Sequence, residues 1–117
     1  MTNGTINENI KNFRTFRGIT QSDLAQRIGK SKNVISNWER GDNSPDVDSV
    51  EKICRELTVT PNQLFGWDVC PEYVDYLKRI ERAKRKLIEL EGQKADIQAR
   101  IDRLTDEVKM IEVIKND

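Results

Sequence analysis

The hydrophobic pattern of the chain changes once along its length. Up to about residue 66, apolar residues recur at three- and four-residue spacing in short segments separated by glycine or proline, which is typical of a bundle of short amphipathic helices. From Pro71 onward they follow a seven-residue repeat over about five repeats. The pattern predicts an all-α protein with a helical domain at residues 1–66, a linker at 67–71 and a long helix at 72–117.

Two short helices joined by a glycine turn are predicted between Thr20 and Gly41. Thr20 and Ser31 suit the N-cap positions, because a hydroxyl accepts a hydrogen bond from a free backbone N–H group of the first turn. Gly29 ends the first helix and Gly41 ends the second, since glycine adopts the left-handed backbone that a helix C-terminus needs. This layout is that of a helix-turn-helix.

Each of the two helices has one apolar face. The residues expected to be buried are Leu24, Ala25 and Ile28 in the first helix, and Val34, Ile35 and Trp38 in the second. The opposite face of the second helix is short and polar, and its amide and amine groups suit base edges and phosphate oxygens. A solvent-exposed polar face is the alternative interpretation.

The register of small and apolar residues is more specific than a glycine between two helices, which any helical hairpin has. Counted from Gln21, the small residue is fifth, the glycine ninth, the aliphatic residue fifteenth and the large apolar residue eighteenth. With this register, residues of about 6–66 resemble the lambda-repressor-like helix-turn-helix family, which includes Cro and phage repressors. Further matching features are the Thr20-Gln21 opening, Leu24-Ala25, the Trp38-Glu39-Arg40-Gly41 ending and the Pro45 that follows.

The resemblance implies a five-helix domain that binds double-stranded DNA. It implies that Gln21 binds a backbone phosphate, that residues matching Ser31, Lys32, Asn33 and Asn37 face the major groove, and that Arg14 and Glu39 form an internal ion pair. Arg14 is therefore interpreted as structural. Amide side chains can pair bidentately with adenine and an amine can reach guanine.

The candidate DNA contacts fall into two sets. The side chains expected to contact bases are Lys32, Asn33, Ser36 and Asn37. Those expected to contact phosphates, and so to fix the register on the duplex, are Gln21, Lys30, Ser31 and Arg40.

Capping signals indicate the other three helices of the domain. Thr5 and Glu8 have capping-box spacing before a first helix that ends at Gly18. The run 42–45 is expected to supply a cap and a proline at the first helical position, and Thr60-Pro61 repeats this device before a short fifth helix. The expected buried residues are Ile6, Ile10 and Phe13, then Val47, Val50, Ile53, Cys54 and Leu57, and finally Leu64 and Phe65.

The seven-residue repeat predicts that the long helix forms a coiled coil. Its seam is expected to comprise Ile80, Leu87, Leu90, Ile97, Ile101, Leu104, Val108 and Ile111, with Ala83 and Lys94 in the remaining positions. Because a single helix cannot bury this stripe, we expect a homodimer or tetramer, with trimers also possible from the mixed Leu and Ile. A hairpin folded at Gly92 is the alternative.

The orientation of the paired helices is left open by the charges beside the seam. A parallel pair would bring Arg79 to Lys84 and Glu107 to Glu112, which are like charges, and Lys86 to Glu91, which are opposite charges. An antiparallel pair would bring Lys86 near Glu107 and Lys84 near Glu112, although each such surface pair contributes less than about 1 kcal/mol.

Net charge is zero, but the charges are segregated along the chain. Residues 6–41 carry a balance of +4, residues 42–76 carry −6, the run 78–86 carries +5 and residues 87–117 carry −3. Only the side of the domain with the motif is therefore expected to attract phosphate. The basic run is interpreted as a coil surface, with a second DNA contact as the alternative.

The composition argues against several classes of protein function. Histidine is absent and Cys54 and Cys70 have no CxxC spacing, so we expect no metal, cofactor or disulfide. No catalytic constellation is visible, and no segment suits a membrane span or signal peptide, so a cytoplasmic protein that is not an enzyme is expected. The expected function is sequence-specific transcriptional regulation, as a repressor on a palindromic operator of a mobile element or bacterial gene. A protein-interaction adaptor that uses the coil is the alternative, and a regulatory protein that binds the coil is a further expected partner.

Overall fold

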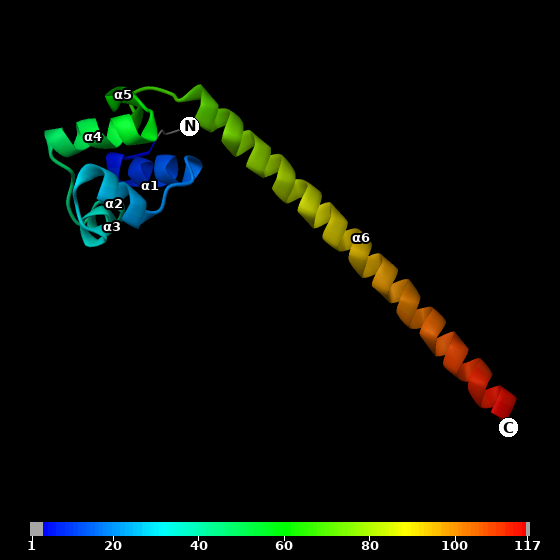
Figure 1. Cartoon of the computed structure of the whole chain (residues 1–117). Helices are drawn as coiled ribbons and strands as arrows, with labels where there is room; N and C mark the ends of the chain where they lie inside the picture. The colour runs from blue at the N-terminus through cyan, green and yellow to red at the C-terminus, as the bar shows by residue number, and fades with distance from the viewer. Residues whose placement is uncertain (1–3, 117) are drawn as a thin grey trace. The chain divides into compact units, whose positions relative to one another are not determined.

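A computed structural model describes residues 4–116, and these form six α-helices and no strand (Figure 1). The helices are α1 (Ile6–Phe16), α2 (Gln21–Ile28), α3 (Lys32–Arg40), α4 (Val47–Leu57), α5 (Pro61–Leu64) and α6 (Pro71–Asn116). The prediction of an all-α chain, with five short helices before one long helix, is confirmed.

The chain divides into two units, one that ends at Leu77 and one that begins at Lys78. The first unit contains α1 to α5 together with the first turns of α6. The sequence pattern instead predicts that the helical domain ends at residue 66 and that the coil begins at residue 72. The difference arises from side chains of the first α6 turns that pack on α1, as described below.

Side-chain caps begin the short helices at the residues that their sequence signals indicate. Thr5, Thr20, Ser31 and Thr60 each accept a hydrogen bond from a backbone N–H three residues later, at distances of 3.3, 3.1, 3.4 and 3.1 Å. The full capping box forms at Thr60, whose own N–H donates to the Gln63 side chain at 3.0 Å. The first helix ends at Phe16, two residues before the predicted end at Gly18.

The start of α4 differs from its prediction. Asp46 is the N-cap and accepts the Ser49 N–H at 2.9 Å, so Pro45 lies before the cap and not at the first helical position. Hydrogen bonds from the side chain and the backbone of Ser49 lower the pKa of the Asp46 carboxyl. Val47 was predicted to be buried, but its side chain is 83% exposed because this first turn extends past the core.

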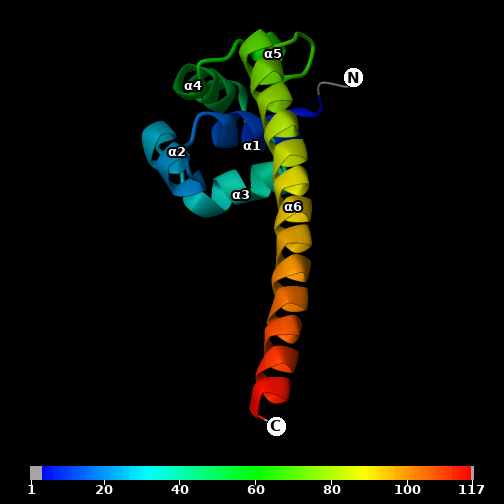
Figure 2. The same cartoon turned by 90° about the vertical axis from the view of Figure 1, so that its right-hand side faces the viewer.

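The core of the first unit lies where α1, α2, α3, α4 and α5 meet (Figure 2). Its fully buried large side chains are Ile10, Leu24, Ile35, Ile53, Leu57 and Leu64. Trp38 and Cys54 are also in the core, as predicted, and burial raises the pKa of the Cys54 thiol. Ile19 and Cys70 are buried as well, although they lie in connecting segments that helical periodicity does not cover.

An aromatic cluster joins the first α6 turns to α1. The Tyr73 ring meets the Phe13 and Phe16 rings edge-on, with centroids 5.2 and 5.6 Å apart, and Tyr76 lies 4.9 Å from Phe16. Burial raises the pKa of the Tyr73 phenol, and the neighbouring Tyr76 adds to this shift. Such ring pairs contribute beyond their buried area, which explains why residues up to Leu77 belong to the first unit.

α6 runs without a break from Pro71 to Asn116, so the alternative of a hairpin folded at Gly92 is wrong. A helix of this length extends for roughly 70 Å at about 1.5 Å per residue. None of its described side chains is buried within the single chain, and the seam residues Leu87, Ile97 and Leu104 are each more than half exposed. No helix among the described residues combines the length and the apolarity that a bilayer span requires.

Candidate nucleic-acid interface

The helix-turn-helix is built on the buried faces of α2 and α3. Leu24 and Ala25 from α2 pack in the same core as Ile35 and Trp38 from α3. Gly29 connects the helices with a φ of 73°, a backbone conformation that glycine adopts at low cost. Because one face of α3 is fixed in this way, its other face is held toward the outside of the domain.

The four candidate base-contacting residues all lie on α3, but their surroundings differ. Lys32 and Asn33 are exposed, and within the described part of the chain their side chains form no hydrogen bond or ion pair. Ser36 and Asn37 are half-buried and accept hydrogen bonds from Arg40. The first turn of α3 therefore presents side chains that are free to bind, whereas the second turn presents side chains that are already held.

Arg40 was a candidate phosphate contact, and its guanidinium lies over the second turn of α3. Nη1 donates to the Ser36 hydroxyl at 2.7 Å, Nη2 donates to the Asn37 amide oxygen, and Nε donates to Asp42 at 3.1 Å. Because an amide oxygen has two lone pairs, the Asn37 oxygen retains one for a base amino group. Arg40 thus fixes the orientation of two candidate base-contacting side chains.

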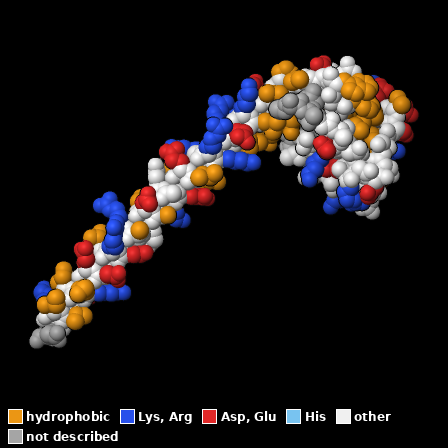
Figure 3. Space-filling view, turned by 180° about the vertical axis from the view of Figure 1, so that it is seen from behind, with side chains coloured by type: hydrophobic (Ala, Val, Ile, Leu, Met, Phe, Trp, Pro, Cys, Tyr) orange, Lys and Arg blue, Asp and Glu red, His pale blue; other side chains and the backbone are white. Residues whose placement is uncertain are grey.

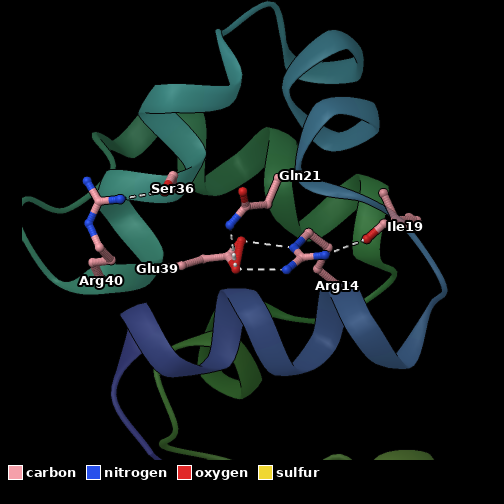
Figure 4. A network of polar contacts seen from close by, with 6 residues as sticks. All are labelled: Arg14, Ile19, Gln21, Ser36, Glu39 and Arg40. Carbon is pink, nitrogen blue, oxygen red and sulfur yellow. Dashed lines mark hydrogen bonds and ion pairs between the residues drawn. The ribbon is translucent and has the colours of Figure 1, made fainter.

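A second polar network joins the end of α1, the start of α2 and the end of α3 (Figure 4). Arg14 donates from Nε and Nη2 to the two carboxylate oxygens of Glu39, both at 2.9 Å, and from Nη1 to the Ile19 carbonyl at 2.9 Å. The side chains of Arg14 and Glu39 are 13% and 4% exposed. A bidentate pair that is this well buried has a fixed geometry, so it sets the angle between the axes of α1 and α3.

Gln21 extends this network toward the surface. Its side-chain amide donates to Oε1 of Glu39 at 3.3 Å, as Figure 4 shows. The candidate phosphate contact at the start of α2 is therefore positioned by the same carboxylate that holds Arg14. The resemblance implied the Arg14–Glu39 pair and, separately, a phosphate contact for Gln21, and the structure joins the Gln21 side chain to that pair.

The other two phosphate candidates lie at the turn. The Ser31 hydroxyl caps α3 by accepting the Val34 N–H, so it lies beside the positive end of that helix. Lys30 is exposed, and its charge contributes to lowering the pKa of Asp46. An ammonium group next to a helix N-terminus is a suitable environment for a phosphate.

The positive charge of residues 6–41 is partly used within the protein. Arg14 is paired with Glu39, Arg17 with Glu72 at 3.2 Å, and Arg27 with Glu56 at 3.6 Å. Arg17 also donates to the Leu57 carbonyl at 2.7 Å. Lys11, Lys30 and Lys32 form no ion pair in the described part of the chain, so the charge that can attract phosphate is smaller than the balance of +4 suggests.

Asn7 is a structural residue of the site that sequence reasoning missed. Its side-chain amide donates to the Trp38 carbonyl at 2.6 Å and to the Asn43 carbonyl at 3.1 Å. These bonds attach the C-terminus of α3 to α1. No signal in the sequence distinguishes Asn7 from an exposed helical asparagine, because its partners are backbone atoms more than 30 residues away.

No other feature of the described residues suggests a chemical site. No group of three or more metal-ligating side chains lies together among them. An apolar groove lies between α4 and α5, and Val47, Cys54 and Phe65 are among the residues that line it. This groove contains no catalytic arrangement, so the outer face of α3 is the candidate functional site.

Comparisons with known proteins point to the same part of the chain. Residues 10–64 match the family described as Helix-turn-helix. The transcriptional activator BcrR of Enterococcus faecalis is 34% identical over 60 residues, which cover 51% of this chain and 29% of BcrR. The antitoxin PezA of Streptococcus pneumoniae is 32% identical over 63 residues, which cover 54% of this chain and 40% of PezA. The chain therefore matches less than half the length of these relatives.

A solved structure shows a similar arrangement. The P22 c2 repressor, in complex with a synthetic operator, superimposes with a TM-score of 0.53 and is 28% identical. The alignment covers 56% of this chain and 98% of that chain. The similarity therefore extends over little more than half of this chain.

Proposed function

We propose that the protein is a transcriptional regulator that binds double-stranded DNA in a sequence-specific manner, because residues 10–64 match the helix-turn-helix family and the chain superimposes on the P22 c2 repressor. In this function α3 enters the major groove. The first turn of α2 and the turn between the helices contact the sugar-phosphate backbone on either side.

The observation that carries the proposal is the contrast between the two faces of α3. Ile35 and Trp38 are 0% and 5% exposed on one face, whereas Lys32 and Asn33 on the other face are exposed and bond to no side chain among residues 4–116. A helix that is fixed on one side and polar on the other matches the requirements of major-groove readout. The operator complex of the P22 c2 repressor supports the same use of the fold.

Within this function the residues have separate tasks. Lys32, Asn33, Ser36 and Asn37 contact bases, and Gln21, Lys30, Ser31 and Arg40 contact phosphates. Arg40 releases or shares its bonds to Ser36 and Asn37 when it reaches a phosphate. Arg14 and Glu39 act only by positioning Gln21 and α3.

We further propose that the protein acts as a repressor, as a dimer or higher oligomer assembled through α6. Few free cations lie near the motif, so one domain makes few phosphate contacts and binds weakly by itself. Two domains bound to two half-sites gain affinity by multivalency. A symmetric protein requires a palindromic operator, with half-sites separated by about one helical turn or a multiple of it.

Titration of operator DNA with variants of α3 tests the proposal. We expect Asn33→Ala to weaken binding to a preferred sequence by about tenfold, because a bidentate base contact contributes about 1–3 kcal/mol of discrimination. Binding to random DNA should change little. Asn12→Ala is the matched control, since Asn12 is an exposed asparagine on α1, and it should leave both affinities unchanged.

A regulator whose Asn33→Ala variant binds every sequence as the wild type does would contradict the proposed role of α3. Failure of the wild-type protein to bind any DNA would instead favour an adaptor that works through α6.

A further inference from the structure

We propose that α6 pairs with the α6 of a second copy in antiparallel orientation, with the two-fold axis between residues 95 and 96. This inference rests on the proposed self-association and adds the orientation and the register to it. The surface in question is the seam of the second unit, whose first residue Ile80 is half-buried and whose positions from residue 83 to residue 111 are exposed in the single chain.

The seam of one α6 is complementary to the seam of a second α6 that runs in the opposite direction. In an antiparallel coil the a positions of one helix meet the d positions of the other. About the proposed axis, every a position from residue 80 to residue 108 meets a d position of the second copy. The resulting layers are Ile80 with Ile111, Ala83 with Val108, Leu87 with Leu104, Leu90 with Ile101, and Lys94 with Ile97.

The distribution of charge along α6 also favours the antiparallel pair. The run 78–86 has six basic residues and one acidic residue, and Figure 3 shows these basic side chains gathered on one part of the helix. In the proposed register this run lies beside residues 105–113 of the second copy, which carry three acidic residues and one basic residue. A parallel, in-register pair would instead place the basic run against its own copy, which is unfavourable.

The charged residues beside the seam favour the same orientation. In the antiparallel register Lys86 faces Glu107 of the second copy, and the two-fold axis repeats this pair. A parallel register would pair Lys86 with Glu91 instead, but it would also place Lys94 against Lys94 inside the seam and Glu107 against Glu112 at its edge. Charges that flank a seam set partner orientation, so they favour the antiparallel pair.

The basic run 78–86 is explained by this arrangement without a second DNA contact. Only Arg85 and Lys86 of this run form ion pairs within the chain, with Glu81 at 3.6 Å and Glu89 at 3.4 Å, among the described residues. Both pairs are exposed, so they break at little cost when the second copy supplies acidic partners.

Distance measurement between spin labels on the full-length protein tests the orientation. A label at Glu81→Cys lies at the level of residue 110 of the second copy, so the antiparallel pair gives a label separation of about 45 Å from the helix rise. A parallel pair gives less than about 25 Å, because adjacent helix axes are about 8–10 Å apart. Cys54 and Cys70 are buried, and alanine replaces both so that only the new thiol is labelled.

Asp96→Cys provides the matched control label. Residue 96 lies beside the proposed axis, so its labels should be less than about 25 Å apart in either orientation. A long distance at residue 81 with a short distance at residue 96 supports the proposal. Short distances at both positions, a mixture at residue 81, or no intermolecular distance would overturn it.

A charge reversal provides a second, independent readout by sedimentation equilibrium. In the antiparallel pair Glu107→Lys faces Lys86 twice, so the dimer dissociation constant should rise by about tenfold, and adding Lys86→Glu should restore it. In a parallel pair Glu107→Lys would instead relieve repulsion with Glu112 and tighten the dimer, which would overturn the orientation. DNA binding is measured separately, so a parallel dimer that binds operator would leave the proposed function intact.

Discussion

At the residue scale, one carboxylate organises the candidate interface. Glu39 accepts two bonds from Arg14 and one from Gln21, and it lies on the helix that presents the candidate base contacts. A buried charge that loses its partner is costly. Arg14 and Glu39, which are not candidate DNA contacts themselves, therefore determine where the candidate contacts lie.

Replacing Glu39 tests this role. Glu39→Gln keeps the size of the side chain but leaves the Arg14 guanidinium without a countercharge, so we expect the free energy of unfolding to fall by about 2 kcal/mol. Urea denaturation monitored by circular dichroism measures it. Glu51→Gln is the control, because Glu51 forms an exposed pair with Arg55, and it should change stability by less than about 0.5 kcal/mol.

The cap of α4 should make stability depend on pH. The pKa of Asp46 is lowered by hydrogen bonds from Ser49, so the charged carboxylate favours folding above the usual pKa range of aspartate. That contribution is lost as the pH falls through the lowered pKa. Asparagine also caps helices, so Asp46→Asn removes the charge alone.

We expect the wild type to have the higher urea midpoint at pH 6, and the difference from Asp46→Asn to shrink as the solution is acidified toward about pH 2. Urea titrations across this pH range measure it. A difference that stays constant with pH would show that the carboxylate charge has no part in the cap.

Sequence reasoning named the candidate residues of the site and the Arg14–Glu39 pair, but not the bonds that Gln21 and Arg40 form. Capping residues such as Thr20 and Ser31 can be recognised in the sequence because the cap and the backbone N–H that it accepts lie three residues apart. Asn7 was missed because its partners are distant backbone carbonyls. Arg17 was counted as free positive charge, although it pairs with Glu72, because side-chain pairing depends on tertiary packing.

At the element scale, helix periodicity predicted the cores of the helices better than their ends. Val50 and Cys54 of α4 are buried as predicted, whereas Val47, which has the same spacing, is exposed. Periodicity shows which face of a helix is apolar but not how far the neighbouring helices extend along it. The exposure of the first turn of α4 therefore could not be predicted from the periodicity.

The continuity of α6 gives a prediction for Gly92. The glycine is helical, and a Cβ added to it would meet nothing within 4 Å. Gly92→Ala should stabilise the protein by about 0.5–1 kcal/mol, since alanine has the higher helix propensity. Thermal denaturation followed by circular dichroism at a fixed protein concentration measures it.

Gly29→Ala is the contrasting variant for the same experiment. Its site also has room for a Cβ, but its φ of 73° disfavours any L side chain, so we expect destabilisation by about 1 kcal/mol. Destabilisation by Gly92→Ala would instead indicate that the chain turns at this glycine in solution.

At the scale of the whole molecule, the proposed regulator needs both of its units. The first unit contains the candidate DNA contacts, and the second contains an apolar seam that is mostly exposed among the described residues. The sequence predicted two parts because a seven-residue repeat differs from the spacing in the short helices, but it placed their boundary before the first turns of α6 and not after them. It could not predict the partner or the operator, since neither is encoded in contacts within one chain.

Disrupting the seam should separate association from DNA contact. Ile97→Lys places a charge at a central seam position, opposite Lys94 in the antiparallel register, so we expect monomers at micromolar concentration. Operator affinity should fall by about a hundredfold through the loss of multivalency. Ala95→Lys is the control, because residue 95 lies outside the seam, and it should preserve the dimer and the affinity.

The central claim is that the outer face of α3 reads DNA sequence. Selection of bound fragments from a random DNA pool by the purified protein, followed by sequencing, tests it most directly. We expect enrichment of an inverted repeat whose half-sites are about one helical turn apart or a multiple of it, and loss of that enrichment in the Lys32→Ala, Asn33→Ala double variant. A pool that remains unenriched at low salt, or that is enriched equally by the double variant, would contradict the claim.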